Sequence, residues 1–356
     1  MREGRINLYS DTQTRPSPAM REAMASAEVA DEQRFIDPTV NALCEQVSEL
    51  LDKEAAVFMP SGTICNQIAI CVHCRPGDEI YAHETAHIIN YEGGGPAALA
   101  GAMVRPLPGE RGMYQTEDLR FAIRDGGRYG PKPSLVEIEQ TANLGGGSVW
   151  PPERLKAVAD VAREFDLRMH MDGARLMNAV VASGVPAKDM VRAFDSVWID
   201  LTKGLGCPVG AVLAGSKEFI DDAWRWKQRM GGAMRQAGIV AAAGIYALAH
   251  NVERLADDHA NARYFAGRAT SIDGVTLPYG EVDTNIVFLD VSGTGVPAKD
   301  IVAYLESHGV NVGAMGDALL RVVTHLDVDR AGVEEAAEVF QAAVAELREE
   351  ASTHAS

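Results

Sequence analysis

A single lysine follows directly on an apolar stretch of the chain. Residues 197–199 (Val-Trp-Ile) predict a short buried strand, and Lys203 comes just after it, beside Gly204 and Gly206. Glycine lets the backbone turn and lets a bulky group approach closely. A lysine that loses water there has a lowered pKa, and its neutral amine can form a Schiff base with a carbonyl. Taken alone, the stretch also fits a surface lysine, so the interpretation depends on the residues that accompany it.

Two further groups complete a recognisable set. Asp172 ends the apolar-rich stretch 167–171, and Ser61, Gly62 and Thr63 connect a strand-like segment to a helix-like one. Enzymes that use pyridoxal phosphate need a Schiff-base lysine, a carboxylate that keeps the ring nitrogen protonated, and a phosphate cradle. Backbone N–H groups at a helix start point toward an anion, and the two hydroxyls add donors. In the order cradle, aspartate, lysine, the set predicts a pyridoxal phosphate enzyme.

The chain also resembles a known family, the threonine aldolases of the β-eliminating lyase group, which are fold-type-I pyridoxal phosphate enzymes. The resemblance covers about residues 5 to 345. It is carried by the segments 10–16 (SDTQTRP), 37–41 (DPTVN), 58–63 (FMPSGT), 170–175 (HMDGAR), 202–205 (TKGL), 231–236 (GGAMRQ) and 320–325 (LRVVTH).

The resemblance implies a role for each matching residue. The catalytic set is Lys203, Asp172 and His87, whose ring stacks on the cofactor and is a candidate for proton transfer at the substrate hydroxyl. The resemblance further implies two sets of binding residues: Lys203, Asp172, Arg175, His87, Ser61, Gly62, Thr63, Thr202 and Arg235 for the cofactor, and Ser10, Arg175 and Arg321 for the substrate. Arginine suits the latter task because its planar cation grips a carboxylate through two hydrogen bonds. Arg235 is expected near the cofactor phosphate of a neighbouring subunit.

Two departures from the family pattern concern the substrate. Residues 34–36 (Arg-Phe-Ile) replace a Tyr-Gly-Glu before Asp-Pro, and Ala142 stands where the family often has a histidine. The expected reaction is retro-aldol cleavage of a threonine-like β-hydroxy-α-amino acid to glycine and an aldehyde. The alternatives are another reaction at Cα, namely β-elimination, racemisation or transamination, and a non-catalytic scaffold of the same fold.

Two short motifs could bind zinc instead. His83, Glu84 and His87 match the H-E-x-x-H pattern of zinc proteases, in which both histidines share one face of a helix. No convincing third ligand follows, and three glycines at 93–95 end any helix soon afterwards. Residues 71–74 (Cys-Val-His-Cys) resemble half of a zinc site without a second pair. No metal site is therefore predicted.

The pattern of elements indicates the fold class. Short apolar strands are expected at 55–59, 79–82, 103–107, 135–138, 168–171, 196–200 and 210–214, with helices such as 152–165 between them. Such alternation predicts an α/β fold with a mostly parallel seven-stranded sheet, and the resemblance specifies the aspartate aminotransferase fold. Ligands in these sheets bind beyond the carboxyl ends of the strands.

The expected domain organisation follows the same pattern. Residues 1–45 form an N-terminal arm and helix that pack on the small domain or on a neighbouring subunit, and 46–250 form the large cofactor-binding domain. An alanine-rich segment at 238–255 is expected to be one long helix that joins it to a small α+β domain at 251–348. Residues 349–356 are expected to be a disordered tail.

Composition limits the partners and the compartment. The chain has 356 residues, 47% of them hydrophobic, and a formal charge of -17, which disfavours nucleic acid and anionic membranes. No apolar segment follows a basic start, and no run approaches membrane-spanning length. Five cysteines suit a reducing cytoplasm better than a disulfide framework. The resemblance implies a homotetramer, a dimer of dimers with shared active sites, acting on a small-molecule amino acid.

Overall fold

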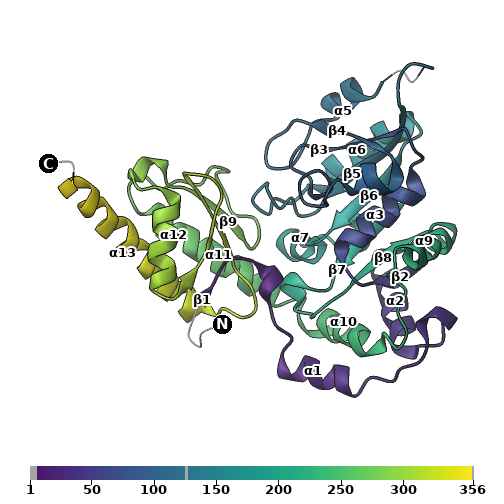
Figure 1. The fold of residues 1–356 in the computed structure, drawn as a ribbon, viewed down its shortest axis with the longest axis horizontal. Helices are drawn as coiled ribbons and strands as arrows, with labels where there is room; N and C mark the ends of the chain where they lie inside the picture. Colours follow the sequence, from purple (N-terminus) through teal and green to yellow (C-terminus); the bar gives the residue numbers. More distant parts are fainter. Residues whose placement is uncertain (1–5, 125–126, 355–356) are drawn as a thin grey trace. The chain divides into compact units, whose positions relative to one another are not determined.

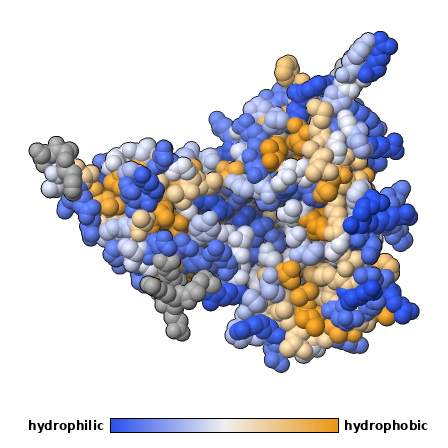
Figure 2. All heavy atoms as spheres, in the orientation of Figure 1, coloured by the Kyte–Doolittle hydropathy of each residue, from blue (hydrophilic) through white to orange (hydrophobic). Residues whose placement is uncertain are grey.

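The computed structural model describes residues 6–124 and 127–354, which form two compact units. The larger unit is Pro16–Val252, and the smaller combines Met1–Arg15 with Glu253–Ser356. Figure 1 shows both as layers of helices on sheets. Hydrophilic residues cover much of the face seen in Figure 2, with hydrophobic areas between them. In the part of the chain that the structure describes, no helix combines the length and the apolar character needed to span a membrane.

The larger unit is built on a seven-stranded sheet in the order β2-β8-β7-β6-β5-β3-β4. Its strands are β2 (Ala55–Met59), β3 (Asp78–His83), β4 (Met103–Leu107), β5 (Lys132–Glu139), β6 (Arg168–Gly173), β7 (Ser196–Asp200) and β8 (Ala211–Gly215). Only β8 runs antiparallel to its neighbours, β2 and β7. The prediction of a mostly parallel seven-stranded sheet is confirmed.

Helices cover the sheet. The α-helices of this unit are α1 (Pro18–Ala25), α2 (Pro38–Leu51), α3 (Gly62–His73), α4 (His87–Asn90), α5 (Thr116–Ala122), α6 (Pro152–Glu164), α7 (Leu176–Ser183), α8 (Ala187–Met190), α9 (Lys217–Arg229) and α10 (Gly238–His250). Short helical turns are η2 (Glu32–Arg34), η3 (Pro96–Ala100) and η4 (Lys203–Leu205). Apolar side chains of α3 and α9 pack with Val57, Met59 and Trp198 of the sheet in one core cluster. The start of α3 is thereby held against β7.

Local sequence explains where α2 begins. Pro38 occupies its first turn, and the Asp37 carboxylate accepts hydrogen bonds from the backbone N–H groups of Thr39 and Val40. An aspartate cap followed by proline is a strong start signal because both satisfy the first turn of a helix. The start expected at Pro38 is therefore confirmed.

The prediction of one long helix at 238–255 is wrong. The structure has two helices there, α10 and α11 (Leu255–Thr270), separated by residues 251–254. Asn251 ends α10, and its side-chain N–H group donates to the carbonyl of Leu205 at 2.7 Å. Asparagine competes with helical hydrogen bonding through its own side chain, which favours a helix end over a helix interior.

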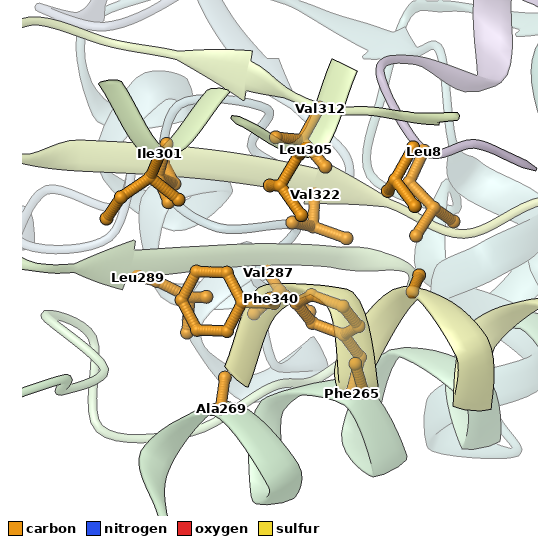
Figure 3. Close-up of a cluster of buried hydrophobic side chains, with 14 of the residues drawn as sticks. Leu8, Phe265, Ala269, Val287, Leu289, Ile301, Leu305, Val312, Val322 and Phe340 are labelled. Carbon is orange, nitrogen blue, oxygen red and sulfur yellow. The ribbon is translucent and has the colours of Figure 1, made fainter. Parts of the chain in front are cut away.

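Among its described residues, the smaller unit contains two small sheets and three α-helices. β9 (Ile286–Asp290), β11 (Gly313–Ala314) and β12 (Leu319–Val323) form an antiparallel sheet in the order β11-β12-β9, and β1 (Ile6–Asn7) pairs in parallel with β10 (Val310–Asn311). Helices α11, α12 (Ala298–Ser307) and α13 (Arg330–His354) and the turns η1 (Asp11–Gln13) and η5 (Ser292–Thr294) complete it. Phe265, Val287, Leu289, Ile301 and Phe340 meet in its core (Figure 3).

These boundaries differ from the expected ones in two places. The first fifteen residues belong to the smaller unit, while α1 and α2 pack with α10 in the larger one. Helix α13 continues to His354, five residues past Glu349, where a disordered tail was expected. Residues 343–351 (AVAELREEA) are rich in alanine, glutamate and leucine, which favour helix, and this outweighs their terminal position.

Candidate active site

The ends of two neighbouring strands bring the predicted lysine and aspartate together. β6 and β7 are parallel, and Asp172 near the end of β6 is in register with Trp198 of β7. The chain leaves β7 at Asp200 and enters the turn η4 at Lys203. Both groups therefore lie beyond the carboxyl ends of the sheet, where open α/β folds bind ligands.

Lys203 forms an ion pair with Asp200, a residue that the sequence motifs did not predict for the site. The Nζ atom of Lys203 lies 2.6 Å from Oδ2 of Asp200, and its side chain is 17% exposed. The other Asp200 oxygen accepts hydrogen bonds from the backbone N–H and the hydroxyl of Thr202, at 2.9 and 2.7 Å. Lys203 has a φ of 52°, a left-handed conformation that is costly for a side-chain-bearing residue and is concentrated at functional sites.

Asp172 is a buried carboxylate with two hydrogen-bond donors. Its Oδ1 accepts from the backbone N–H of Ala174 at 3.0 Å, and its Oδ2 accepts from the side chain of Asn66 at 2.8 Å. Burial raises the pKa of Asp172, while His87, Asn66 and Lys203 act in the opposite direction. Its pKa is thus set by a balance between lost hydration and nearby donors or cations.

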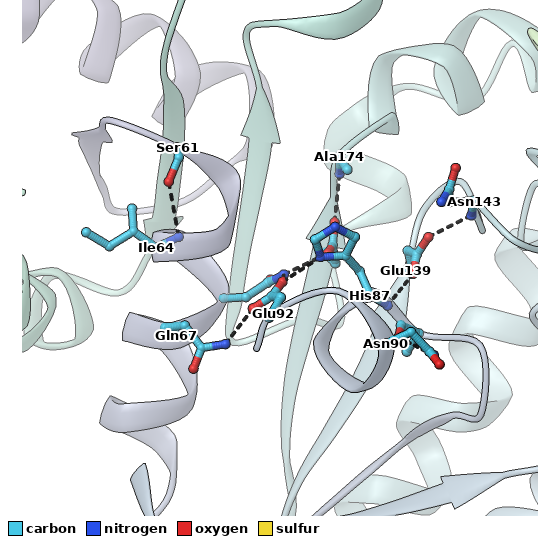
Figure 4. Close-up of polar contacts among 12 residues, drawn as sticks. Ser61, Ile64, Gln67, His87, Asn90, Glu92, Glu139, Asn143 and Ala174 are labelled. Carbon is cyan, nitrogen blue, oxygen red and sulfur yellow. Dashed lines mark hydrogen bonds and ion pairs between the residues drawn. The ribbon is translucent and has the colours of Figure 1, made fainter. Parts of the chain in front are cut away.

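His87 is anchored at both its backbone and its ring (Figure 4). Its backbone N–H donates to Glu139 at 2.9 Å, and its Nδ1 lies 2.8 Å from Oε1 of Glu92. Glu92 also accepts hydrogen bonds from Asn66 and Gln67. Burial lowers the pKa of His87, but the carboxylates of Glu92, Asp172 and Glu139 outweigh it, so the net change is upward.

The zinc-protease pattern does not form a zinc-protease site. His83 is the last residue of β3, and His87 is the first residue of α4. Residues 84–86 between them are not helical, so the two histidines do not share one face of a helix. Nδ1 of His83 instead accepts a hydrogen bond from the backbone N–H of Thr85 at 3.1 Å. His87, Glu92 and Asp172 have ligand atoms within 4.8 Å of one another, but Nδ1 of His87 already bonds Glu92, and Asn66 donates to both carboxylates.

The start of α3 supplies an anion-binding position beside these groups. Ser61 caps the helix by accepting a hydrogen bond from the backbone N–H of Ile64 at 3.4 Å, and Gly62 is the first helical residue. A Cβ atom at Gly62 would lie 2.2 Å from the indole of Trp198, so only glycine lets the helix come this close to β7. The first N–H groups of a helix have no intrahelical acceptor and attract phosphate. A capped helix start, a buried carboxylate and a lysine therefore lie near the ends of β6 and β7.

Comparison with known proteins decides the family. Residues 7–293 match the model of the β-eliminating lyases. The chain belongs to the β-eliminating lyase family. It is 40% identical to the low-specificity L-threonine aldolase of Escherichia coli, over 96% of this chain and 99% of that protein. It is 32% identical to the alanine racemase of the fungus Cochliobolus carbonum, over 94% of this chain and 87% of that protein. The threonine aldolase structure of Leishmania major superposes with a TM-score of 0.84, 20% identity, and coverage of 95% and 99%.

That structural likeness confirms the predicted aspartate aminotransferase fold. Members of the β-eliminating lyase family depend on pyridoxal phosphate. The residues of this lyase fit such a group, because the donor set combines a helix N-terminus with an amine and a buried carboxylate.

The remaining predicted site residues lie in different places. Arg175 is buried at the start of α7, and its backbone N–H donates to the carbonyl of Gln140. Arg235 lies at the surface, 3.1 Å from Asp31, with 64% of its side chain exposed. Ser10 and Arg321 belong to the smaller unit, where Ser10 caps η1 and Arg321 lies on β12. The structure thus groups Asp172, Thr202, Lys203, His87 and the start of α3 within one unit.

The site face of the sheet carries acids that strand periodicity could have revealed. Glu137 and Glu139 of β5 point to the same side as His170 and Asp172 of β6, because alternate residues of a strand share a face. Glu137 is buried, and neither of its carboxylate oxygens has a hydrogen-bond partner among the described residues. Burial, reinforced by Asp172 and Glu139, raises the pKa of Glu137 well above its ordinary value.

This acid makes stability fall with rising pH. Above its ordinary pKa of 4.5, the unfolded chain releases the Glu137 proton while the folded chain retains it, so stability present below pH 4.5 is lost as pH rises toward the folded-state pKa. We expect Glu137→Gln to remove this slope, which amounts to about 1.4 kcal/mol per pH unit. Urea unfolding at about pH 5 and about pH 8 measures it, with exposed Glu153→Gln as the control. If the unfolding free energy changed equally between the two pH values in Glu137→Gln and in wild type, Glu137 would not be the cause of the pH dependence.

Ala142 occupies a tightly packed position. It is 3% exposed, and a Cβ added at Gly112 would lie 2.3 Å from the Cβ of Ala142. A Cβ added at Gly145 would lie 3.0 Å from the same atom. The loop around Gly112 therefore fills space that a longer side chain at 142 would need.

Restoring a histidine at this position should consequently destabilise the protein. We expect Ala142→His to lower the free energy of unfolding by about 1–3 kcal/mol, the usual cost of overpacking. Thermal unfolding measures the loss, and Ala142→Ser serves as the small polar control. An Ala142→His protein as stable as wild type would show that the Gly112 loop moves aside readily.

Proposed function

We propose that this β-eliminating lyase cleaves threonine-like β-hydroxy-α-amino acids to glycine and an aldehyde with pyridoxal phosphate. The observation that carries the proposal is the junction of β6, β7 and α3, where Lys203, the buried Asp172 and a capped helix start come together. The 40% identity to a low-specificity L-threonine aldolase over nearly the whole chain supports the choice of reaction. When bound, the cofactor supplies an electron sink for the electrons released at Cα.

Residues of the larger unit would hold the cofactor. Lys203 would attach its aldehyde, and Asp172 would face the ring nitrogen and keep it protonated. Ser61, Gly62 and Thr63 at the start of α3, together with Thr202, would bind the phosphate, since helix N-termini favour anions. Arg235 would add a charge to the phosphate from a second copy of the chain, which its surface position allows.

His87 is suited to take the proton from the substrate hydroxyl. Its Nδ1 faces a carboxylate oxygen of Glu92, an acceptor, so Nδ1 carries the hydrogen in the neutral ring. The other nitrogen, Nε2, is then the basic atom that can accept a proton. Arg175 of the same unit would hold the substrate carboxylate, which would fix the bond at Cα that is broken.

A panel of amino acids tests the proposed reaction. The purified protein with pyridoxal phosphate is incubated with L-threonine, L-allo-threonine and β-phenylserine, and glycine and aldehyde are quantified. We expect equal amounts of glycine and aldehyde from at least one of them. No aldehyde from any β-hydroxy amino acid would refute the aldolase.

Racemisation is the second candidate. It is favoured by the 32% identity to an alanine racemase and by Ala142, which provides no proton-transfer group at its position. Incubation with L-alanine and chiral analysis of the product separate the two reactions. Appearance of D-alanine without aldehyde release from the panel would establish the racemase instead.

We also propose a cytoplasmic homotetramer with shared active sites. Phe35 and Ile36 are 60% and 53% exposed, and large apolar side chains at the surface suit an interface between copies. The five free cysteines fit a reducing compartment. Light scattering of wild type and of Phe35→Ser/Ile36→Ser tests the assembly, and a monomeric wild type would refute it.

A further inference from the structure

A chain of buried polar side chains leads away from Asp172, between α3 and the sheet. Asn66 of α3 donates to Asp172 at 2.8 Å, and its Oδ1 lies 3.1 Å from Nε2 of His170. The other ring nitrogen of His170 lies 2.8 Å from the hydroxyl of Ser196, which lies 2.7 Å from Nε2 of His73 at the end of α3. Asn66, His170 and Ser196 are fully buried. These three side chains are therefore shielded from bulk water, whereas His73 at the far end is partly exposed.

Trp198 fixes the orientation of the Asn66 amide. Its indole N–H, which can only donate, lies 2.6 Å from Oδ1 of Asn66. The amide oxygen therefore faces Trp198, and the NH₂ group faces the other way. The two hydrogens of this NH₂ group point at Oδ2 of Asp172 and at Oε1 of Glu92. The distance from Nδ2 of Asn66 to Oε1 of Glu92 is 2.7 Å. Both contacts are of the donor-to-carboxylate kind, which is stronger than a neutral pair.

The remaining hydrogens then have one allowed arrangement. Because Oδ1 of Asn66 accepts, Nε2 of His170 must carry a hydrogen. Burial lowers the pKa of His170 to about 3 and that of His73 to about 4, so both rings are neutral at pH 7. Nδ1 of His170 then accepts from the Ser196 hydroxyl, and the Ser196 oxygen accepts from Nε2 of His73. Each donor in the chain points toward Asp172.

We propose that Asn66 is a positioning residue for Asp172. The chain of hydrogen bonds from His73 through Ser196 and His170, together with Trp198, holds its amide so that an N–H bond faces the carboxylate and favours the ionised form. The role of Asp172 toward the cofactor ring rests on the proposed function, whereas the contact with Asn66 does not.

The charged groups around Asp172 explain why the Asn66 donor affects its ionisation. Glu139 lies beside it in register on β5, with Glu137 two residues earlier, and Glu92 follows α4. Glu92 and Glu139, when ionised, disfavour a negative charge on Asp172, whereas Glu137 retains its proton. His87 of α4 and Lys203 after β7 favour the negative charge, as does the neutral donor Asn66. Asn66 is thus the one neutral side chain that these described contacts bring to the Asp172 carboxylate.

The test measures Asp172 in the cofactor-free protein, so it does not depend on activity. Carbon-13 NMR of labelled aspartate follows its carboxyl through a pH titration in wild type, Asn66→Leu and Ser196→Ala, with Asp172→Asn to assign the signal. We expect Asn66→Leu, which is close in size, to raise the Asp172 pKa by about one unit or more. Ser196→Ala removes the support of His170 but keeps the direct contacts of the Asn66 amide with Trp198 and His170, so it should shift the Asp172 pKa much less. An unchanged Asp172 titration in folded Asn66→Leu would overturn the proposal.

A second measurement uses wild type alone and remains available if Asn66→Leu does not fold. In nitrogen-15 spectra of histidine-labelled protein at neutral pH, His170 and His73 should both be neutral with the hydrogen on Nε2. A hydrogen on Nδ1 of His170 would overturn this arrangement of hydrogen bonds. If these results hold while no aldehyde is released from any substrate, the proposed function fails and the role of Asn66 stands.

Discussion

Replacing Lys203 with alanine should abolish turnover, with kcat lower by a factor on the order of 10⁴ or more, as for loss of a covalent catalytic group. Lys203 is the amine that the β6–β7 strand ends place beside Asp172, and its Nζ lies 2.6 Å from Asp200. Without that amine the cofactor has no covalent attachment to the protein. Aldehyde release from the preferred substrate, measured with excess pyridoxal phosphate, checks the prediction.

Lys203→Arg is the matched variant. Arginine keeps a cation beside Asp200, so the fold and the local charge are retained, but it offers no nucleophilic amine. We expect Lys203→Arg to unfold at a temperature close to that of wild type and to be as inactive as Lys203→Ala. Treatment with borohydride should add the cofactor mass to a Lys203-containing peptide of wild type only. Full activity in either variant would remove Lys203 from the mechanism.

The largest expected effect on stability is at a buried ion pair between α9 and the turn η2. Nζ of Lys227 on α9 lies 2.7 Å from Oε1 of Glu32, and both side chains are fully buried. The same oxygen accepts a hydrogen bond from the backbone N–H of Met234 at 2.6 Å. Removing one partner leaves the other charge buried and unpaired, which costs about 3–5 kcal/mol. We expect a loss of this size in the unfolding free energy of Lys227→Met.

Two controls separate the pair from a general effect of losing a lysine. Lys217→Met on the same helix removes a well-exposed lysine whose partner, Asp221, is 3.6 Å away, and should change stability little. Adding Glu32→Gln to Lys227→Met removes the stranded charge and keeps an acceptor for Met234, so most of the loss should be recovered. If the double variant is no more stable than Lys227→Met, the burial of charge is not the cause.

The pair also bears on the proposed phosphate contact. The turn η2 and the segment around Arg235 meet through it, since Glu32 bonds the backbone of Met234 and Asp31 bonds Arg235 itself. Sequence periodicity gave no sign of this contact, because Glu32 sits in a polar turn and Lys227 in a helix with many charged residues.

The amino-acid sequence by itself determined the elements and the chemistry of the main groups. The bounds expected for β2, β4 and β7 agree with the structure to the residue, because each is a short apolar run between turn residues. The motifs around Ser61, Asp172 and Lys203 indicated the cofactor chemistry, because that chemistry requires a phosphate-binding helix start, a carboxylate and an amine.

Only the tertiary structure decided which groups surround them. Asn66, Glu92 and Trp198 come from three different segments, and their contacts depend on how α3 packs against β7 and on the register of β6 with β7. The zinc-like His83 and His87 pattern failed for the same reason, since a strand end and a turn, rather than one helix, separate the two rings. Spacing along a chain specifies which residues are available, whereas directions and distances between segments arise only when the core is packed.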